Sequence, residues 1–158
     1  MAGSAVTGRR EGLIPSKTIL VTASCGQNAR TDIRSGQFSW VIDEPVSFGG
    51  DNTAPSPVEM LLGSIAGCIA AVGQLIAREM GHQLQSLAIR IEGDVNSDLF
   101  FGKSDIERAG FQEIRIEIDA SCSWTADERE SWMEQVIRRC PVIDNLSLPT
   151  PMDFSFAD

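Results

Sequence analysis

The chain has 158 residues, with 22 acidic against 13 basic side chains, a formal net charge of −9, four cysteines, one histidine and no tyrosine. This length fits one domain with a substantial core, and the acidic balance argues against binding to nucleic acid or to an anionic membrane, because both need a basic face. A single histidine excludes metal sites that need two imidazoles. Proton chemistry must then depend on carboxylates, thiols or His82, and thiols are the most reactive of these groups.

The N-terminal stretch, residues 1–17, is rich in glycine, serine, alanine and charge, which predicts a disordered tail before a single domain at residues 18–158. No apolar run follows Arg9 and Arg10, so no secretory signal is expected and a cytoplasmic setting is the default. Structural disulfides are then improbable. The cysteines, at positions 25, 68, 122 and 140, lack the paired spacing of a zinc site, so we expect no metal.

The first part of the domain has the pattern of a small sheet. Residues 18–24, 30–34 and 37–42 are predicted strands, and in the last of them Phe38, Trp40 and Ile42 share one face. A loop with a double glycine and two prolines follows, over residues 43–55.

A long helix is predicted to begin at Pro57, with Ser56 as the cap and Glu59 as the capping-box acid, and to end near Met80. It contains 18 consecutive uncharged residues, enough at ~1.5 Å per residue to nearly cross a bilayer. Its glycines and polar residues favour a buried helix of a soluble domain instead. Its many small residues permit close approach of other backbones, and a partner subunit in a two-fold dimer would cover one face.

The second part of the domain continues with strands at residues 87–92 and 113–121. A capping box from Thr125 to Glu128 opens a second helix that is expected to end at Cys140, with Pro141 as the stop. The tail at residues 152–156 can form a last strand. Because the strands are adjacent in sequence, we expect an α+β fold in which an antiparallel sheet wraps the long central helix.

Cys68 lies near the middle of the central helix, and its simplest interpretation is a small core thiol. Burial raises a thiol pKa, so a reactive Cys68 needs a cation from another segment or from a partner chain. Cys140 ends the second helix beside two arginines, which favour its thiolate, while the helix dipole disfavours it. Cys122 is expected in the core, and nothing distinguishes Cys25.

Glu59 has a structural role as the capping acid and a possible second role in orienting a cation near Cys68. Nine residues separate Glu59 from Cys68, which places the two residues on opposite sides of the helix and ~13 Å apart. His82 follows Gly81 and is expected to be a solvated loop residue.

Several short motifs follow one another along the chain: Asp43-Glu44-Pro45, Gly49-Gly50, Pro55 to Leu62, Cys68 and the later Arg139-Cys140-Pro141-Val142. This ordered set, over roughly residues 18–147, resembles the OsmC/Ohr superfamily. The resemblance implies an intertwined homodimer whose sheets wrap two central helices, with two sites at the subunit interface. It also implies that Cys68 attacks a hydroperoxide and becomes a sulfenic acid, which Cys140 then resolves as a disulfide.

The sequence departs from the peroxidase members at the arginine that they hold near the attacking thiolate. Gln27 stands at the Ohr-type position, and Phe48 or its neighbours stand at the OsmC-type one. Val58 occupies the usual place of the helix glutamate, with Glu59 one residue later. Arg30 is the first candidate for the missing cation, ahead of Arg34.

These features and the resemblance are compatible with three alternative functions. The first is thiol-dependent reduction of organic hydroperoxides, which uses no bound cofactor but needs an external dithiol or lipoyl reductant. The second is a non-catalytic OsmC-like protein that binds a small apolar or thiol-containing ligand in the dimer cleft. The third is a redox sensor in which a reversible disulfide alters the binding of a partner.

Overall fold

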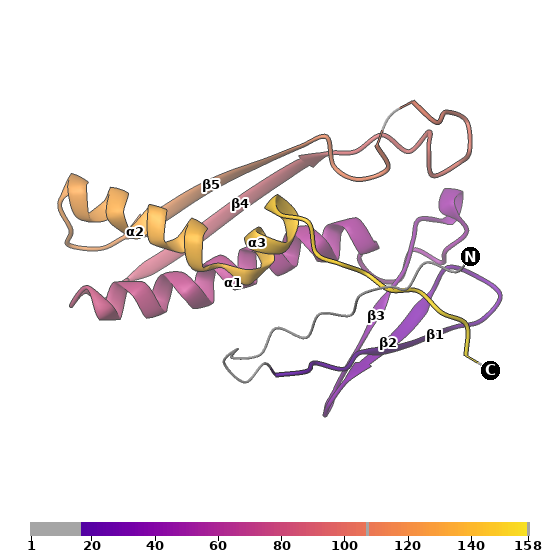
Figure 1. Ribbon diagram of the computed structural model, residues 1–158, viewed down its shortest axis with the longest axis horizontal. Helices are drawn as coiled ribbons and strands as arrows, with labels where there is room; N and C mark the ends of the chain where they lie inside the picture. Colours follow the sequence, from indigo (N-terminus) through magenta and orange to yellow (C-terminus); the bar gives the residue numbers. More distant parts are fainter. Residues whose placement is uncertain (1–16, 107, 158) are drawn as a thin grey trace, which may run out of the picture. The chain divides into compact units, whose positions relative to one another are not determined.

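The computed structural model describes residues 17–106 and 108–157 (Figure 1). It divides the chain into two compact units between Ser56 and Pro57, and each is described here by itself. Almost all of the predicted N-terminal tail lies outside the described residues. That residues 18–158 form one domain stays a prediction.

The first unit contains a three-stranded antiparallel sheet of β1 (Thr22–Cys25), β2 (Thr31–Ser35) and β3 (Phe38–Ile42), followed by a short 3₁₀ helix, η1 (Val46–Phe48). Ile33 pairs with Trp40, and Thr31 with Ile42. The apolar residues of β3 therefore share the face that the alternation predicts. The first strand begins four residues later than predicted, and the exposed apolar side chains of residues 19–21 precede it.

The loop after β3 is organised by a buried carboxylate. Asp43 is 0% exposed and accepts hydrogen bonds from the backbone N–H groups of Glu44 (2.8 Å), Asp51 (3.1 Å) and Thr53 (2.8 Å), and from the Thr53 hydroxyl (2.8 Å). Gly50 passes so close that a Cβ there would lie 2.0 Å from the Glu44 carbonyl oxygen and 2.5 Å from Asp43 Oδ1. The Asp-Glu-Pro and Gly-Gly motifs therefore form one folded loop.

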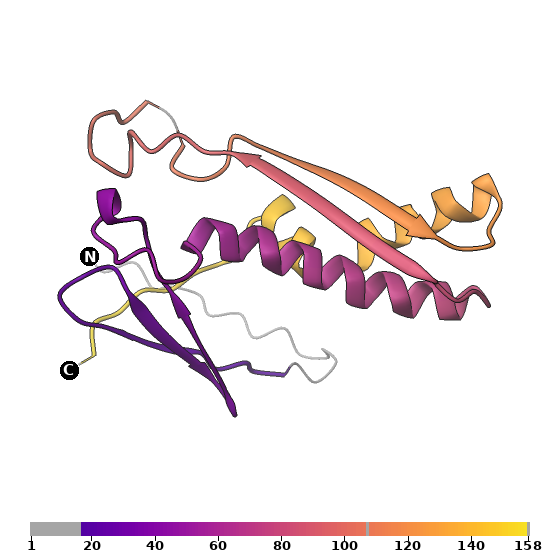
Figure 2. The same cartoon turned by 180° about the vertical axis from the view of Figure 1, so that it is seen from behind.

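The second unit is built around α1 (Pro57–Glu79), which Gly81 follows in a left-handed conformation, with φ of 80°. The strands β4 (Ser86–Asp94) and β5 (Glu113–Ser121) form an antiparallel ribbon, and α2 (Ala126–Arg139) and α3 (Pro141–Ser147) complete the unit. The ribbon and α2 both run along α1 (Figures 1 and 2).

The core of the second unit lies where these elements meet. Its buried side chains come from α1, from α2 and from the turn between α1 and β4. They are Ile65, Ile69, Ile76, Ala77, Leu84, Trp132 and Val136. The isoleucines on the inner face of the β4–β5 ribbon pack against this cluster. Burial of these side chains is the main favourable contribution to folding.

The predicted α+β class, with antiparallel sheets and a long central helix, is confirmed, although the strands form two sheets rather than one. Pro141 does more than stop α2, because it occupies the first turn of α3, where its missing N–H costs nothing. Residues 152–156 carry no strand: the side chains of Met152, Phe154 and Phe156 are exposed, and no ladder pairs this segment in the described chain.

Candidate functional site

Two of the four cysteines meet in the second unit. The sulfur of Cys68, on α1, lies 2.6 Å from the sulfur of Cys140, at the junction of α2 and α3, and both are free thiols. Cys140 is fully buried, and Cys68 is half-buried. A small movement of either side chain would give disulfide geometry. The structure therefore brings together the two cysteines that the sequence singles out.

The backbone of Cys140 is held from both sides. Its N–H donates to the carbonyl of Val136 in the last turn of α2, and its own carbonyl accepts from Asp144 in α3, both at 3.0 Å. The residue is the C-cap of α2 and the N-cap of α3, in an extended conformation. Pro141, with its fixed φ, starts the next helix at once. Cys140 thus sits at a rigid corner that directs its thiol toward α1.

The position of α2 on α1 is set by Trp132 and Gly73. The indole N–H of Trp132 donates to the Gly73 carbonyl at 2.9 Å, and the indole ring lies where a side chain at position 73 would be. Trp132 is 1% exposed. This contact fixes the distance between the helices and therefore the approach of Cys140 to Cys68.

The surroundings of Cys68 disfavour its thiolate. Burial raises the pKa of the Cys68 thiol, and the hydrogen bond with Cys140 raises it further, while the backbone N–H of Val142 lowers it; the net shift is upward. None of these groups is a cation. Within the described part of the chain, the Val142 amide, in the first turn of α3, is the group that stabilises a negative charge on this sulfur.

The arginine next to Cys140 has another partner. Arg139 forms a two-pronged ion pair with Glu79 at the end of α1, with Nη2 2.9 Å from Oε1. The hydrogen bonds from Arg139 lower the pKa of Glu79, and the carboxylate in turn raises the pKa of the guanidinium. Glu79 is three turns beyond Cys68 on α1, ~16 Å along the axis. Arg139 therefore anchors the end of α2 to α1.

The other two predicted site residues are Glu59 and Arg30. Glu59 lies exposed in the first turn of α1, and the spacing argument that separates it from Cys68 holds in a regular helix. Arg30 belongs to the first unit, where its guanidinium pairs with Asp32 at 3.2 Å. Their roles toward Cys68 stay predictions.

The remaining thiols and the histidine differ in their surroundings. Cys25 is exposed at the end of β1, and Cys122 is half-buried with its thiol 3.6 Å from the Gln83 carbonyl. The expectation of a solvated His82 is wrong. Its side chain is only 16% exposed, and Nε2 lies 3.2 Å from Glu128, because the turn after α1 folds it onto the capping box of α2.

Two features of the site could not be predicted from the sequence. The Val142 amide is a backbone group and leaves no side-chain signal. The Gly73–Trp132 contact joins residues 59 positions apart, and only the presence of a glycine on the helix face hints at a close approach. The adjacency of Arg139 to Cys140 is a misleading signal, because the arginine side chain reaches away along α1 to Glu79.

Comparisons with known proteins agree with this fold. A family model described as "OsmC-like protein" matches residues 50–155. A search of curated proteins gave no match. Among solved structures, an OsmC-like protein from Mycoplasma pneumoniae is 21% identical with a TM-score of 0.71, covering 84% of this chain and 89% of that chain.

Two further structures are described as organic hydroperoxide resistance proteins. The one from Legionella pneumophila is 16% identical, with a TM-score of 0.60, over 84% of this chain and 91% of that chain. The one from Elizabethkingia anophelis, with thiocyanate bound, is 19% identical, with a TM-score of 0.61, over 84% and 89%. These likenesses show the fold. Because the family model matches more than half of the sequence, the chain belongs to the OsmC-like protein family.

Proposed function

We propose that this protein is a thiol-dependent hydroperoxide reductase in which Cys68 is the attacking thiol and Cys140 the resolving thiol. The observation that carries the proposal is the 2.6 Å separation of their two sulfurs, on side chains that come from different helices. Membership of the OsmC-like family, which includes proteins described as organic hydroperoxide resistance proteins, supports a role in peroxide stress.

The reaction proceeds in two thiol steps. The Cys68 thiolate attacks the outer peroxide oxygen, the O–O bond breaks, and the alkoxide leaves and takes up a proton as an alcohol, so that Cys68 becomes a sulfenic acid. The Cys140 thiol then attacks the sulfenic sulfur, a disulfide forms, and water leaves. An external dithiol, such as a dihydrolipoyl group, reduces the disulfide by thiol–disulfide exchange and itself becomes a disulfide.

The substrate class follows from the surroundings of Cys68. Cys68 lies within an uncharged, largely apolar stretch of α1, residues 60–77. An apolar site favours alkyl or lipid hydroperoxides over hydrogen peroxide, because an organic tail gains apolar contacts. The protein needs no bound cofactor for this chemistry, and we propose a cytoplasmic setting, where the reductants of thiol enzymes are available.

Such a thiolate needs a cation, and we propose that one of the arginines singled out by the sequence supplies it. Burial and the contact with Cys140 raise the pKa of Cys68, so an opposing positive charge is required near neutral pH. Arg30 is the first candidate and Arg34 the second, with Glu59 as the acid that orients the guanidinium. Arg30→Gln is expected to reduce peroxide turnover at pH 7 more than Arg34→Gln does.

The test is consumption of cumene hydroperoxide with dithiothreitol as the reductant. Cys68→Ser should abolish turnover. In a separate assay without dithiothreitol, which would itself reduce a sulfenic acid, Cys140→Ser should consume one equivalent of peroxide per chain and leave a trappable sulfenic acid at Cys68. Cys25→Ser is the matched control and should retain full activity, because Cys25 is exposed at the end of β1. Equal turnover by wild type and Cys68→Ser would sink the proposal.

A non-catalytic OsmC-like binding protein is the second candidate, and the raised pKa of Cys68 is the observation that favours it. A thiol that stays protonated near neutral pH reacts slowly with peroxides. This candidate predicts a small thiol-containing or apolar molecule that copurifies with the protein, and no peroxide turnover above that of Cys68→Ser.

We also propose that the protein is a homodimer. α1 is apolar and long enough to cross a membrane by length and composition, yet only 28% of its most apolar stretch is buried in the single chain. Its exposed side carries Gly63, Ser64 and Gly67, with Leu75 further along, 43% exposed. Small residues permit close helix approach, so a second copy of α1 is the expected cover.

The oligomeric state tests this second proposal. Gly67 has open space where its Cβ would be, so Gly67→Glu leaves the single chain undisturbed and places a charge on the exposed side of α1. Light scattering should give a dimer mass for wild type and a monomer mass for Gly67→Glu. Gly26→Glu, also in open space, is the matched control. A monomeric wild type at micromolar concentration would contradict the proposal.

A further inference from the structure

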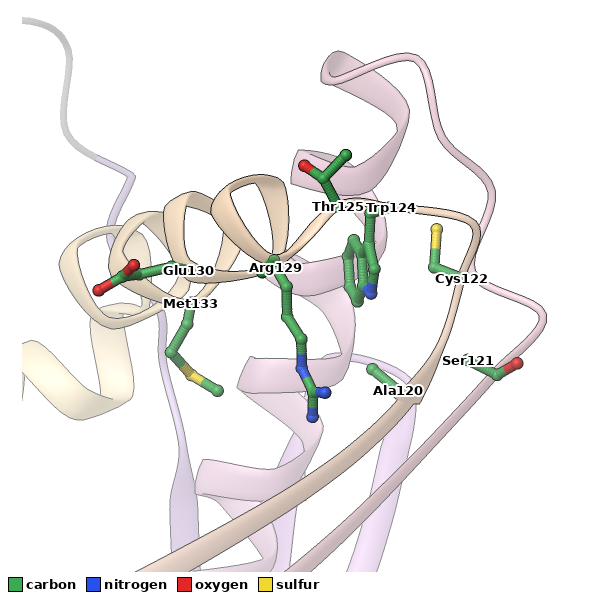
Figure 3. Close-up of a pocket in the computed structure, with 9 residues that line it drawn as sticks. Ala120, Ser121, Cys122, Trp124, Thr125, Arg129, Glu130 and Met133 are labelled. Carbon is green, nitrogen blue, oxygen red and sulfur yellow. The ribbon is translucent and has the colours of Figure 1, made fainter.

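A groove of about 650 Å³ lies between the end of β5 and the start of α2 (Figure 3). Neither Cys68 nor Cys140 lines it, so it is separate from the thiol pair. Its walls come from Ala120 on β5, from Trp124 in the connection, and from Arg129 and Met133 on α2. Its volume falls within the ~300–1,000 Å³ range of pockets that bind small molecules.

The groove contains hydrogen-bond donors that lack acceptors. Figure 3 shows the side chains of Arg129, Met133 and Trp124 extending toward Ala120, with the indole nitrogen of Trp124 at the end of its ring that faces Ala120. Among the described residues, neither the Arg129 guanidinium nor the Trp124 indole N–H has a hydrogen-bond or ion-pair partner in this structure. Arg129 is exposed and Trp124 is half-buried, so both donors are available to a ligand that enters the groove.

The nearby acids do not neutralise this arginine. Glu128 accepts from the backbone N–H of Thr125 at 2.7 Å and lies 3.2 Å from His82 Nε2. Glu130 lines the rim, but its carboxylate extends away from Trp124 and Ala120 in Figure 3. The planar guanidinium of an arginine without a protein partner is free to receive a carboxylate in a two-pronged hydrogen bond.

We propose that this groove binds an organic carboxylate with an apolar body. The planar guanidinium of Arg129 receives the carboxylate in a two-pronged hydrogen bond, and the Trp124 indole N–H donates a third. The apolar body lies against the Trp124 ring, Met133 and Ala120. Trp124 also contacts Trp132, with ring centroids 5.2 Å apart, so an occupied groove touches the tryptophan pair that holds α2 against α1.

The experiment is isothermal titration of the full chain with decanoate, with decanol as the uncharged probe of the same length. Decanoate should bind, and Arg129→Gln should weaken its binding at least about tenfold, because a charge-assisted hydrogen-bond pair is lost. Arg138→Gln removes an exposed arginine from the same helix but outside the groove, and it should bind decanoate as wild type does. Arg129→Lys should retain part of the affinity.

Several outcomes would overturn the proposal: no decanoate binding to wild type, equal binding to Arg129→Gln, or equal binding of decanol. Cys68→Ser should bind decanoate normally, and loss of binding in that variant would place the ligand at the thiol pair instead. Quenching of tryptophan fluorescence on decanoate binding, absent in Trp124→Phe, locates the ligand independently. Thermal melts confirm that each variant is folded, as expected for the exposed position 129.

Discussion

The indole ring of Trp132 occupies the space beside Gly73 where any other residue would place its side chain, and a Cβ at position 73 would lie 2.6 Å from ring atom Cζ2. The same ring donates its N–H to the Gly73 carbonyl. One contact thus sets the spacing of α1 and α2 and, through α2, the position of Cys140.

Gly73→Ala is therefore expected to destabilise the protein by about 1–3 kcal/mol, because the buried indole has no flexible end that can give way. Urea unfolding followed by circular dichroism measures this change. Gly26→Ala, at a site with open space and an ordinary backbone conformation, should leave the midpoint nearly unchanged. A Gly73→Ala variant as stable as wild type would show that the helices can separate without cost.

The proximity of Cys68 and Cys140 predicts selective oxidation. Mild treatment of the reduced protein with diamide should lower the titratable thiols from four per chain to two, and peptide mapping should find Cys68 joined to Cys140. The Cys122→Ser control should oxidise as wild type does. A different pair, or four thiols that persist, would contradict the geometry.

The upward shift of the Cys68 pKa predicts how the reactivity of this thiol depends on pH. Because burial and the contact with Cys140 favour the protonated form, alkylation of Cys68 by iodoacetamide in the Arg30→Gln variant, which lacks the proposed cation, should be slow at pH 7 and still rising at pH 9. Mass spectrometry of the Cys68 peptide with Cys140→Ser added separates the effect of burial from that of the contact, and the curve should move toward lower pH. Wild type should be alkylated faster at pH 7, and equal curves for wild type and Arg30→Gln would mean that Arg30 does not act on this sulfur.

Loss of the Arg139–Glu79 ion pair is expected to lower stability without changing the reactivity of Cys68. Arg139→Gln should lower the free energy of unfolding only slightly, because both side chains are partly exposed to solvent. Its alkylation profile at Cys68 should match wild type. Glu79→Gln should show the same loss, and the double variant should show no further loss. A change in Cys68 reactivity in Arg139→Gln would reassign the arginine to the thiol pair.

The stability that Asp43 gives to the loop after β3 is expected to decrease in acid. Burial raises its pKa, but hydrogen bonds from Thr53, Glu44 and Asp51 outweigh burial and lower the pKa from 3.8 to about 2. The folded state therefore holds the proton less tightly than the unfolded chain. This contribution to stability is fully present above pH 4 and is lost as the pH falls toward 2.

Asp43→Asn should lower the melting temperature at pH 7 and flatten its dependence on pH between 4 and 2. Asp51→Asn, whose side chain is exposed, is the matched control and should keep the wild-type slope. Thermal melts across this range measure both. An unchanged slope in Asp43→Asn would mean that other carboxylates govern acid unfolding.

Most of the local structure was predictable from the sequence because its signals are short-range. Capping residues and apolar periodicity placed both long helices within a few residues, and alternation placed β3, β4 and β5 with the correct faces. The capping box of Thr125 and Glu128 is present as predicted. The predicted start of β1 was four residues too early, because the apolar and β-branched residues that indicate a strand begin at Thr18. In the described chain, β2 pairs with residues 22–25.

The sequence by itself singled out the two thiols, through helix position and through the resemblance of the Cys-Pro junction to an OsmC/Ohr motif, and it predicted the antiparallel α+β class. Only the tertiary structure decided that their sulfurs touch, that Arg139 turns to Glu79, and that His82 is paired with Glu128. Those outcomes depend on contacts between residues 46 to 72 positions apart. Such contacts are set by how helices pack, and packing depends on shape complementarity that no local pattern encodes.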